Sequence, residues 1–83
     1  MRTTRYFEEQ VLRKRPYIQR GWCRDVLAAP IRREIRMDGR IRLWGKVSLA
    51  GESRPRFLRV VTLEDGETVH NAFFDRNFQE DER

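Results

Sequence analysis

Apolar residues recur at two different intervals along the chain, and the change from one to the other divides it into two parts. Up to residue 30 they lie four positions apart, which is typical of amphipathic helices. The residues with this spacing are Phe7 and Val11, and then Ile18, Trp22 and Val26. The spacing predicts one helix over residues 5–14 and a second that starts at Pro16 and closes at residues 28–30.

Polar residues mark the start of the first helix. Thr3 or Thr4 can serve as its N-cap, and Glu8 and Glu9 follow in the first turn, where the helix dipole favours anions. Pro16 ends this helix, because the residue before a proline is pushed out of helical geometry.

From residue 31 onward the apolar residues alternate with polar ones, which is the pattern of β-strands. The alternation predicts four strands, over residues 31–36, 40–47, 57–63 and 68–74. Asp38-Gly39 is a strong hairpin signal, and the segment 48–55 is predicted to be an exposed loop. We therefore expect an α+β fold, with two N-terminal helices packed on a four-stranded antiparallel meander. Residues 1–78 are expected to form this single domain, and residues 79–83 a charged, flexible tail.

The central predicted strand divides its residues between two faces of the sheet. One set is Leu58, Val60 and Thr62, and the other is Phe57, Arg59 and Val61. If the first set faces the helices, the second lines the open face of the sheet. A slip of one residue in register would exchange the two sets.

The chain has 83 residues, which corresponds to one small domain, and its nine aromatic residues argue against intrinsic disorder. Its apolar runs are shorter than the roughly 20 residues that cross a bilayer, and the N-terminus lacks the apolar stretch of a secretory signal. A single cysteine, Cys23, excludes an internal disulfide, and one histidine leaves no ligand set for the usual zinc site. We interpret Cys23 as a small buried hydrophobic residue. These features predict a cytoplasmic protein without a cofactor.

The charge is positive overall and unevenly distributed. The net charge is +5; residues 1–62 carry 16 basic and 6 acidic residues, whereas residues 63–83 carry 2 and 7. Arginine supplies 16 of the 18 basic residues, and its planar guanidinium suits phosphate and carboxylate recognition. Such a chain attracts RNA, DNA or an acidic protein. A GC-rich genome would also explain the preference for arginine over lysine, although it explains the uneven distribution less readily.

His70 is the first candidate for proton transfer, because an unperturbed histidine pKa lies near neutrality. It falls on the fourth predicted strand, within reach of Arg59 on the third. An imidazole and a guanidinium together could move a proton and stabilise the charge that develops when RNA is cleaved through its own 2′-hydroxyl, without a metal. The alternative is a structural histidine, bonded to Thr68 or Asn71.

The second predicted strand carries a candidate nucleic-acid-binding surface. Its residues on one face are Arg40, Arg42, Trp44 and Lys46. Bases would stack on the indole of Trp44 while the cationic groups hold phosphates. The alternative is a solvated strand face on which the aromatic ring packs against arginine stems.

Six short strings stand in order along residues 5–76. They are Arg15-Pro16-Tyr17-Ile18, Ala29-Pro30, Asp38-Gly39-Arg40-Ile41-Arg42, Leu58-Arg59-Val60-Val61-Thr62, Glu64-Asp65-Gly66-Glu67-Thr68-Val69-His70 and Ala72-Phe73-Phe74-Asp75-Arg76. In pattern and order the chain resembles a group of small bacterial proteins of unknown function allied to the BrnT and RelE/ParE-type toxins.

This resemblance implies two helices against a curved antiparallel sheet, whose open face engages RNA and is covered by a small antitoxin protein. It matches Arg59 to the arginine of the central strand and His70 to a histidine on a late strand of some RelE-like members. Related families often carry a histidine and an arginine on the first helix, where this chain has Phe7 and Val11. A non-catalytic relative therefore stays open as an interpretation.

Three functions are consistent with these observations. The first is a RelE/BrnT-like toxin-type domain that binds RNA, on the ribosome or free, and that is a metal-independent endoribonuclease if Arg59 and His70 are catalytic. The second is a non-catalytic basic module for nucleic acid or an acidic protein. The third is a protein–protein contact through an exposed strand edge, such as a homodimer.

Overall fold

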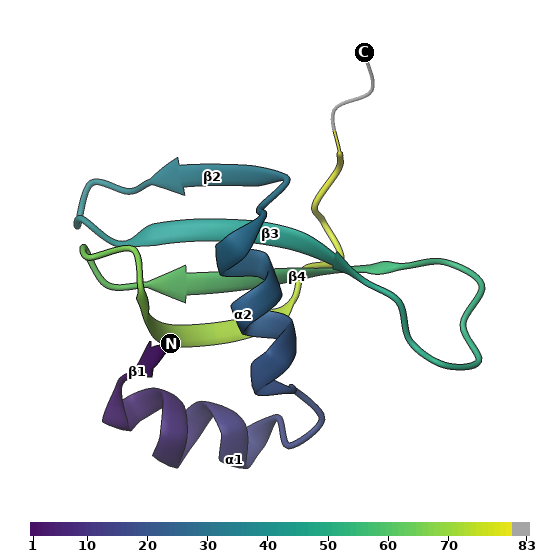
Figure 1. Ribbon diagram of the computed structural model, residues 1–83, viewed down its shortest axis with the longest axis horizontal. Helices are drawn as coiled ribbons and strands as arrows, with labels where there is room; N and C mark the ends of the chain where they lie inside the picture. Colours follow the sequence, from purple (N-terminus) through teal and green to yellow (C-terminus); the bar gives the residue numbers. More distant parts are fainter. Residues whose placement is uncertain (81–83) are drawn as a thin grey trace.

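The computed structural model describes residues 1–80 and shows a five-stranded sheet with the helices on one face (Figure 1). The elements are β1 (Arg2–Thr3), the π-helical turn η1 (Phe7–Val11), α1 (Leu12–Lys14), α2 (Arg20–Ala28), β2 (Arg32–Ile35), β3 (Ile41–Val47), β4 (Arg56–Thr62) and β5 (Thr68–Phe74). The strands lie in the order β1-β5-β4-β3-β2. No helix within residues 1–80 is long and apolar enough to span a bilayer.

The predicted α+β fold is confirmed, and the sheet has one strand more than expected. Strands β2 to β5 form the antiparallel meander, and each of their ends agrees with the prediction within one residue. The additional strand, β1, runs parallel to β5 and pairs Arg2 with Thr68 and Thr3 with Val69. The sheet is therefore mixed rather than wholly antiparallel. A strand of two residues is too short to leave an alternating pattern in the sequence.

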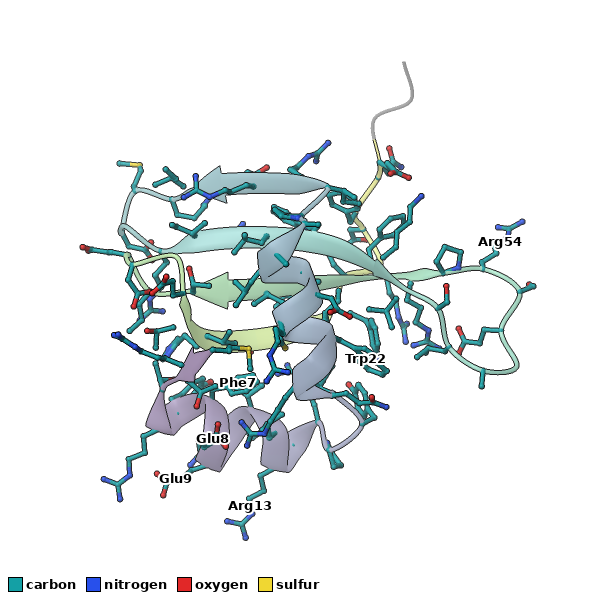
Figure 2. The ribbon with its side chains drawn as sticks, viewed as in Figure 1. Phe7, Glu8, Glu9, Arg13, Trp22 and Arg54 are labelled. Carbon is teal, nitrogen blue, oxygen red and sulfur yellow. The ribbon has the colours of Figure 1, made fainter. Side chains whose placement is uncertain are left out.

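The first helical segment has the predicted extent, residues 5–14, and its middle turn is wound as a π-helix. Thr4 caps it as expected, because the backbone N–H of Phe7 donates to Thr4 Oγ1 at 3.1 Å. Phe7 lies between this segment and the sheet, whereas Glu9 and Arg13 point away from it (Figure 2). The segment thus packs one apolar stripe on the sheet, as its sequence spacing indicates.

The second helix begins at Arg20, four residues later than predicted. Residues 16–17 form a turn, which is closed by a hydrogen bond from the N–H of Ile18 to the carbonyl of Arg15 at 3.0 Å. Ile18 is buried, with 4% of its surface exposed, so it joins the core from this connection rather than from the helix. Ile18 lies four positions before Trp22 and so matches helical spacing by coincidence. The predicted start of the second helix was wrong for this reason.

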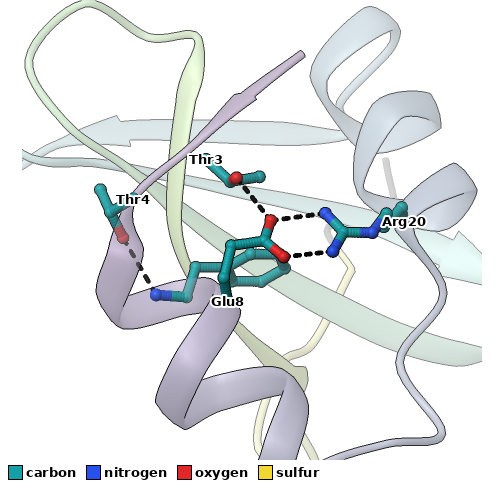
Figure 3. A network of polar contacts seen from close by, with 5 residues as sticks. Thr3, Thr4, Glu8 and Arg20 are labelled. Carbon is teal, nitrogen blue, oxygen red and sulfur yellow. Dashed lines mark hydrogen bonds and ion pairs between the residues drawn. The ribbon is translucent and has the colours of Figure 1, made fainter.

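A carboxylate–guanidinium pair joins the two helices (Figure 3). Arg20 Nη1 donates to Glu8 Oε2 at 2.5 Å, and Arg20 Nη2 donates to Glu8 Oε1. The hydroxyl of Thr3 also donates to Glu8, at 2.5 Å. These donors, Arg20 first, lower the pKa of Glu8 from 4.5 to about 2. Glu8 therefore does more than complement the helix dipole, since it ties β1, the first helical segment and α2 together.

The helices cover the face of the sheet that contains the first residue set of β4. Leu58, Val60 and Thr62 are fully buried, whereas Phe57, Arg59 and Val61 are partly exposed. The first of the two possible face assignments is thus confirmed. Helix α2 crosses β3 at Gly45, where a Cβ atom would lie 2.7 Å from Val26 Cγ2. Glycine at this position lets the helix and the strand approach closely.

The predicted turn at Asp38-Gly39 closes the β2–β3 hairpin. The N–H of Arg36 donates to the carbonyl of Arg40 at 2.8 Å, which leaves three residues in the loop. Gly39 has a φ of 86°, a left-handed conformation that glycine adopts without steric cost. The hairpin brings Arg36 and Arg40 side by side at one end of the open face.

After β5 the chain turns back across the sheet. The N–H of Asp75 donates to the carbonyl of Phe57 at 2.8 Å, and Lys46 Nζ lies 3.0 Å from Glu80 Oε1. Of the charged tail predicted over residues 79–83, the first two residues follow this path. Residues 81–83 lie outside the described part of the chain.

Candidate functional site

The open face of the sheet carries a pocket of about 460 Å³, next to the β2–β3 turn. Its charged and polar lining consists of Arg36, Asp38, Arg40, Arg42, Arg59, His70 and Asn71. Four guanidinium groups therefore line the pocket, and Asp38 is the one carboxylate in the lining. Outside the lining, Glu34 Oε1 lies 3.5 Å from Arg36 Nη1. The volume is within the range of about 300–1,000 Å³ that is usual for small-ligand sites. We call this feature the arginine pocket.

A β-bulge in β5 determines which side chains reach the arginine pocket. Thr62 pairs with Val69 and Val61 pairs with Asn71, so His70 is the extra residue between the two pairs. In a regular strand Val69 and Asn71 would point to the same face. The bulge instead lets His70 and Asn71 both line the pocket while Val69 stays fully buried under the helices.

Arg59 is a partly buried cation with incomplete partners. Its side chain is 23% exposed, and its Nη1 lies 3.9 Å from Asp75 Oδ2. Its Nε is buried without a hydrogen-bond acceptor among residues 1–80. The guanidinium packs over the ring of Phe73 at 4.3 Å. Burial, followed by the nearby charge of Arg42, lowers the pKa of Arg59. An incoming anion would therefore find a cation that the protein itself does not neutralise fully.

His70 is held by residues of the N-terminal segment. Its Nδ1 lies 2.9 Å from Thr4 Oγ1, and its ring stacks on Tyr6 with 4.8 Å between the ring centroids. The predicted structural partners, Thr68 and Asn71, were wrong. The hydroxyl of Thr4 already accepts the N–H of Phe7, so the same residue caps the helix and orients the imidazole.

The chemistry of His70 follows from these contacts. Because Nδ1 is engaged by Thr4, Nε2 is the ring nitrogen left for a ligand. When Nδ1–H donates to Thr4, Nε2 is unprotonated and can accept a proton. Burial and then the nearby charge of Arg40 lower the pKa of His70 below 6.5, which favours a neutral imidazole over an imidazolium at pH 7.

The structure brings together four of the six residues that the sequence singled out. Arg59 and His70 line the arginine pocket with Arg40 and Arg42. Trp44 and Lys46 lie outside its lining.

The chain that follows β5 covers Trp44 and pairs with Lys46, which stays exposed. Trp44 is 4% exposed, and the ring of Phe78 stacks on it at 5.2 Å. Its Nε1 donates to Asp75 Oδ2 at 3.0 Å, while Lys46 pairs with Glu80. The indole face is therefore occupied, and the expectation of an exposed stacking platform does not hold for this conformation.

Several pocket residues were not predicted from the sequence. Arg36 gives a weak signal as the last residue of a strand before an Asp-Gly turn, and its position in the hairpin could have been inferred. Asn71 and Phe73 gave no signal in the sequence. The bulge that turns Asn71 onto the open face has no sequence marker. Thr4 was recognised only as a cap.

No family model, curated protein or solved structure matches this chain. The resemblance to the toxin families therefore stays a prediction from the short strings of the sequence.

Other features of the chain carry less chemistry. Cys23 is fully buried, as predicted, and burial raises the pKa of its thiol to about 11, so it stays protonated. Within residues 1–80, no group of three or more His, Cys, Asp or Glu side chains could hold a metal ion. A cavity of about 530 Å³ near Arg24 and Glu67 is larger than the arginine pocket but has no comparable set of cations.

Proposed function

We propose that this protein binds single-stranded RNA in the arginine pocket, as a RelE/BrnT-like toxin-type domain. One observation carries the proposal: four arginine side chains and a histidine surround one open pocket that holds a single carboxylate. The resemblance to the toxin families adds that a small antitoxin protein would cover the same face.

The arginine pocket is suited to phosphodiesters for two reasons. Guanidinium groups donate in a planar fork that matches two phosphate oxygens, and Arg59 has a buried N–H without an acceptor. A phosphate at the exposed part of this guanidinium would compensate a cation that burial has destabilised. A flexible single strand can also follow a small concave pocket better than a stiff duplex can.

Cleavage would use two groups of the arginine pocket and no metal. His70 Nε2 would accept the proton of the ribose 2′-hydroxyl, and the 2′-oxygen would then attack the adjacent phosphorus. The bond to the 5′-oxygen breaks, that oxygen takes a proton from water, and a 2′,3′-cyclic phosphate remains. Arg59 would stabilise the negative charge that develops on the phosphate oxygens.

Binding is tested with a labelled RNA oligonucleotide by fluorescence anisotropy over a range of salt concentrations. Arg42→Gln is expected to weaken binding about tenfold, or about 1.4 kcal/mol. It should also reduce the slope of log Kd against log salt by about 0.7, as for one lost phosphate contact on a single strand. Arg13→Gln removes the same charge from an exposed site on the first helix and is the matched control (Figure 2). Equal effects of the two substitutions would contradict the proposal.

Cleavage is tested separately on end-labelled RNA. His70→Ala should abolish the cyclic phosphate product and leave binding within about twofold, because the arginines stay in place. A substrate with a 2′-deoxyribose at the cleaved position should bind and stay intact. Because the pKa of His70 is lowered, the rate should fall with acid only below pH 6.5.

A non-catalytic binding module is the second candidate, and one observation favours it. Among the residues that line the arginine pocket, His70 is the one imidazole, and its Nδ1 and ring face are already engaged by Thr4 and Tyr6. Salt-sensitive binding of RNA that the wild type leaves intact, with no cyclic phosphate product, would favour this function over cleavage.

A further inference from the structure

Next to the arginine pocket, the segment that follows β5 packs over Trp44 and Phe57 on the open face. We call residues 76–80 the strap. Phe78 stacks on Trp44 and packs at a tilt against Phe57, with 5.2 and 5.0 Å between the ring centroids. The guanidinium of Arg32 lies 4.8 Å from the centroid of the Phe78 ring. In Figure 1 the segment after β5, drawn in yellow, leaves the sheet beside β4 and passes β3.

The partners of the strap are the groups that bind nucleotides elsewhere. The ring of Phe78 stacks on the indole of Trp44 and lies beside the guanidinium of Arg32. The carboxylate of Glu80 pairs with the ammonium of Lys46 at 3.0 Å. A base would make the first contact and a phosphate the second. The strap therefore presents an aromatic ring and an anion in positions where a nucleotide would present a base and a phosphate.

We propose that Trp44, Arg32 and Lys46 form a second nucleotide subsite for single-stranded RNA, and that the strap occupies it in the free protein. This inference rests on the proposed RNA-binding function. The inference adds a second RNA-binding site on the open face, formed by residues that do not line the arginine pocket. RNA that reaches this subsite displaces Phe78 and Glu80.

Arg59 connects the subsite with the arginine pocket. Its guanidinium lies 5.9 Å from the centroid of the Trp44 ring, and the two residues are direct partners across β3 and β4. The same side chain lines the arginine pocket. A strand of RNA bound in the pocket thus continues toward Trp44 without leaving a cationic surface.

The strap can move without disturbing the fold. It follows Asp75, whose N–H donates to Phe57 O at 2.8 Å and whose carboxylate accepts the indole N–H of Trp44. Asp75 can therefore stay in place as the fixed end. The main apolar cluster lies under the helices on the opposite face and does not include Trp44 or Phe78, although Trp44 is itself buried. Displacement of residues 76–80 costs the side-chain contacts of Phe78 and Glu80 and the hydrogen bond from the N–H of Asn77 to Asp75 Oδ1 at 3.0 Å. It leaves the sheet pairing intact.

Two substitutions in the full-length chain release the strap in different ways. Phe78→Ala removes the stacked ring, and Glu80→Gln removes the anion at Lys46. The controls are Tyr17→Ala, which removes a stacked aromatic ring from the helix-covered side, and Glu9→Gln, which breaks the exposed pair with Arg5. Each control makes the same chemical change as its test variant, away from the open face.

The readout is the affinity for a fluorescein-labelled oligouridylate of about 10 nucleotides, a length within the usual site size of single-strand binders. Phe78→Ala should bind about five- to tenfold more tightly than the parent, because base stacking no longer competes with an internal ring. Glu80→Gln should bind about twofold more tightly and steepen the salt dependence by about 0.7, as for one added phosphate contact. The controls should match the parent.

A second readout follows the indole itself. With Trp22→Phe as background, Trp44 is the one tryptophan of the chain. The oligouridylate should quench its fluorescence more strongly in Trp22→Phe/Phe78→Ala than in Trp22→Phe at equal saturation. This measurement reports stacking even if Phe78→Ala changes stability.

The outcomes separate the two proposals. If the parent binds RNA and Arg42→Gln weakens binding, but neither strap variant binds more tightly and quenching is unchanged, the subsite is wrong and the arginine pocket stands. If no variant binds RNA at all, both proposals are wrong.

Discussion

The two faces of the sheet are built from alternate residues of the same strands, but one buries apolar side chains and the other carries charged ones. On the covered face, Leu58 and Val60 are fully buried and pack in the apolar core. On the open face, Arg59 carries a charge with incomplete partners, and its neighbour Trp44 is covered by the strap. The covered face contributes stability, whereas the open face keeps Arg59 partly buried with incomplete partners, which costs stability and leaves its charge available for an anion.

The largest expected effect tests the covered face. Leu58→Ala should lower the free energy of unfolding by about 3 kcal/mol, because it removes a fully buried side chain and leaves a cavity. Urea denaturation of the purified variant measures the change. The fold is small, so the variant is expected to be partly unfolded at 37 °C. A loss below about 1 kcal/mol would mean that the helices do not pack on this face as described.

A second test addresses the contact between α2 and β3. Gly45→Ala should destabilise the protein by about 1–3 kcal/mol, because the new Cβ would lie 2.7 Å from Val26 Cγ2. Gly21→Ala is the matched control, since a Cβ there meets no atom within 4 Å. At that exposed helical position alanine should stabilise by up to about 1 kcal/mol. Opposite signs in thermal melts confirm the close approach, and equal signs contradict it.

A third test concerns the pair that links the helices above the covered face. Glu8→Gln should cost about 1 kcal/mol at pH 7; both side chains are partly exposed, so solvent screening keeps the value small. The pKa of Glu8 is lowered from 4.5 to about 2 in the folded state. The stabilisation is therefore complete above about pH 4.5 and is lost as the pH falls toward 2.

Urea midpoints measured from pH 7 to pH 2 give the outcome of this substitution. The curves of wild type and Glu8→Gln should converge at the acid end. Glu9→Gln, which breaks the exposed pair with Arg5, is the control and should stay within about 0.5 kcal/mol of wild type throughout. Curves that stay parallel down to pH 2 would assign the effect to packing rather than to the ion pair.

The fold was largely predictable because burial leaves a period in the sequence. Alternation predicted strands β2 to β5 within one residue at each end. Which face the helices cover stayed open, because a slip of one residue exchanges the two faces. β1 was missed because two residues leave no period, and the start of α2 was wrong because Ile18 enters the core from a turn.

The candidate site was only half predictable. Arg40, Arg42 and Arg59 share one face by simple alternation, so their meeting could be foreseen. The bulge that places Asn71 in the pocket and the bond from Thr4 to His70 depend on contacts between residues far apart in sequence. The position of Phe78 over Trp44 depends on a segment that has no periodic pattern, so the coverage of Trp44 could not be foreseen.

Arg59→Met is expected to have the smallest effect on stability, and it is the most direct test of the difference between the two faces of the sheet. Arg59 follows Leu58 on β4 and points to the opposite face. Arg59→Met keeps an apolar stem over Phe73. It removes a cation whose pKa is lowered by burial and whose Nε has no acceptor within residues 1–80. The free energy of unfolding should therefore change by less than about 0.5 kcal/mol, or rise.

The same substitution should weaken RNA binding about tenfold in the anisotropy assay, because a phosphate loses its donor. Leu58→Ala and Arg59→Met would then separate stability from binding at two consecutive residues. A loss of about 2 kcal/mol in Arg59→Met, comparable to a core substitution, would show that the arginine is a structural residue. The two faces would then not differ as described, and the arginine pocket would lose its least neutralised cation.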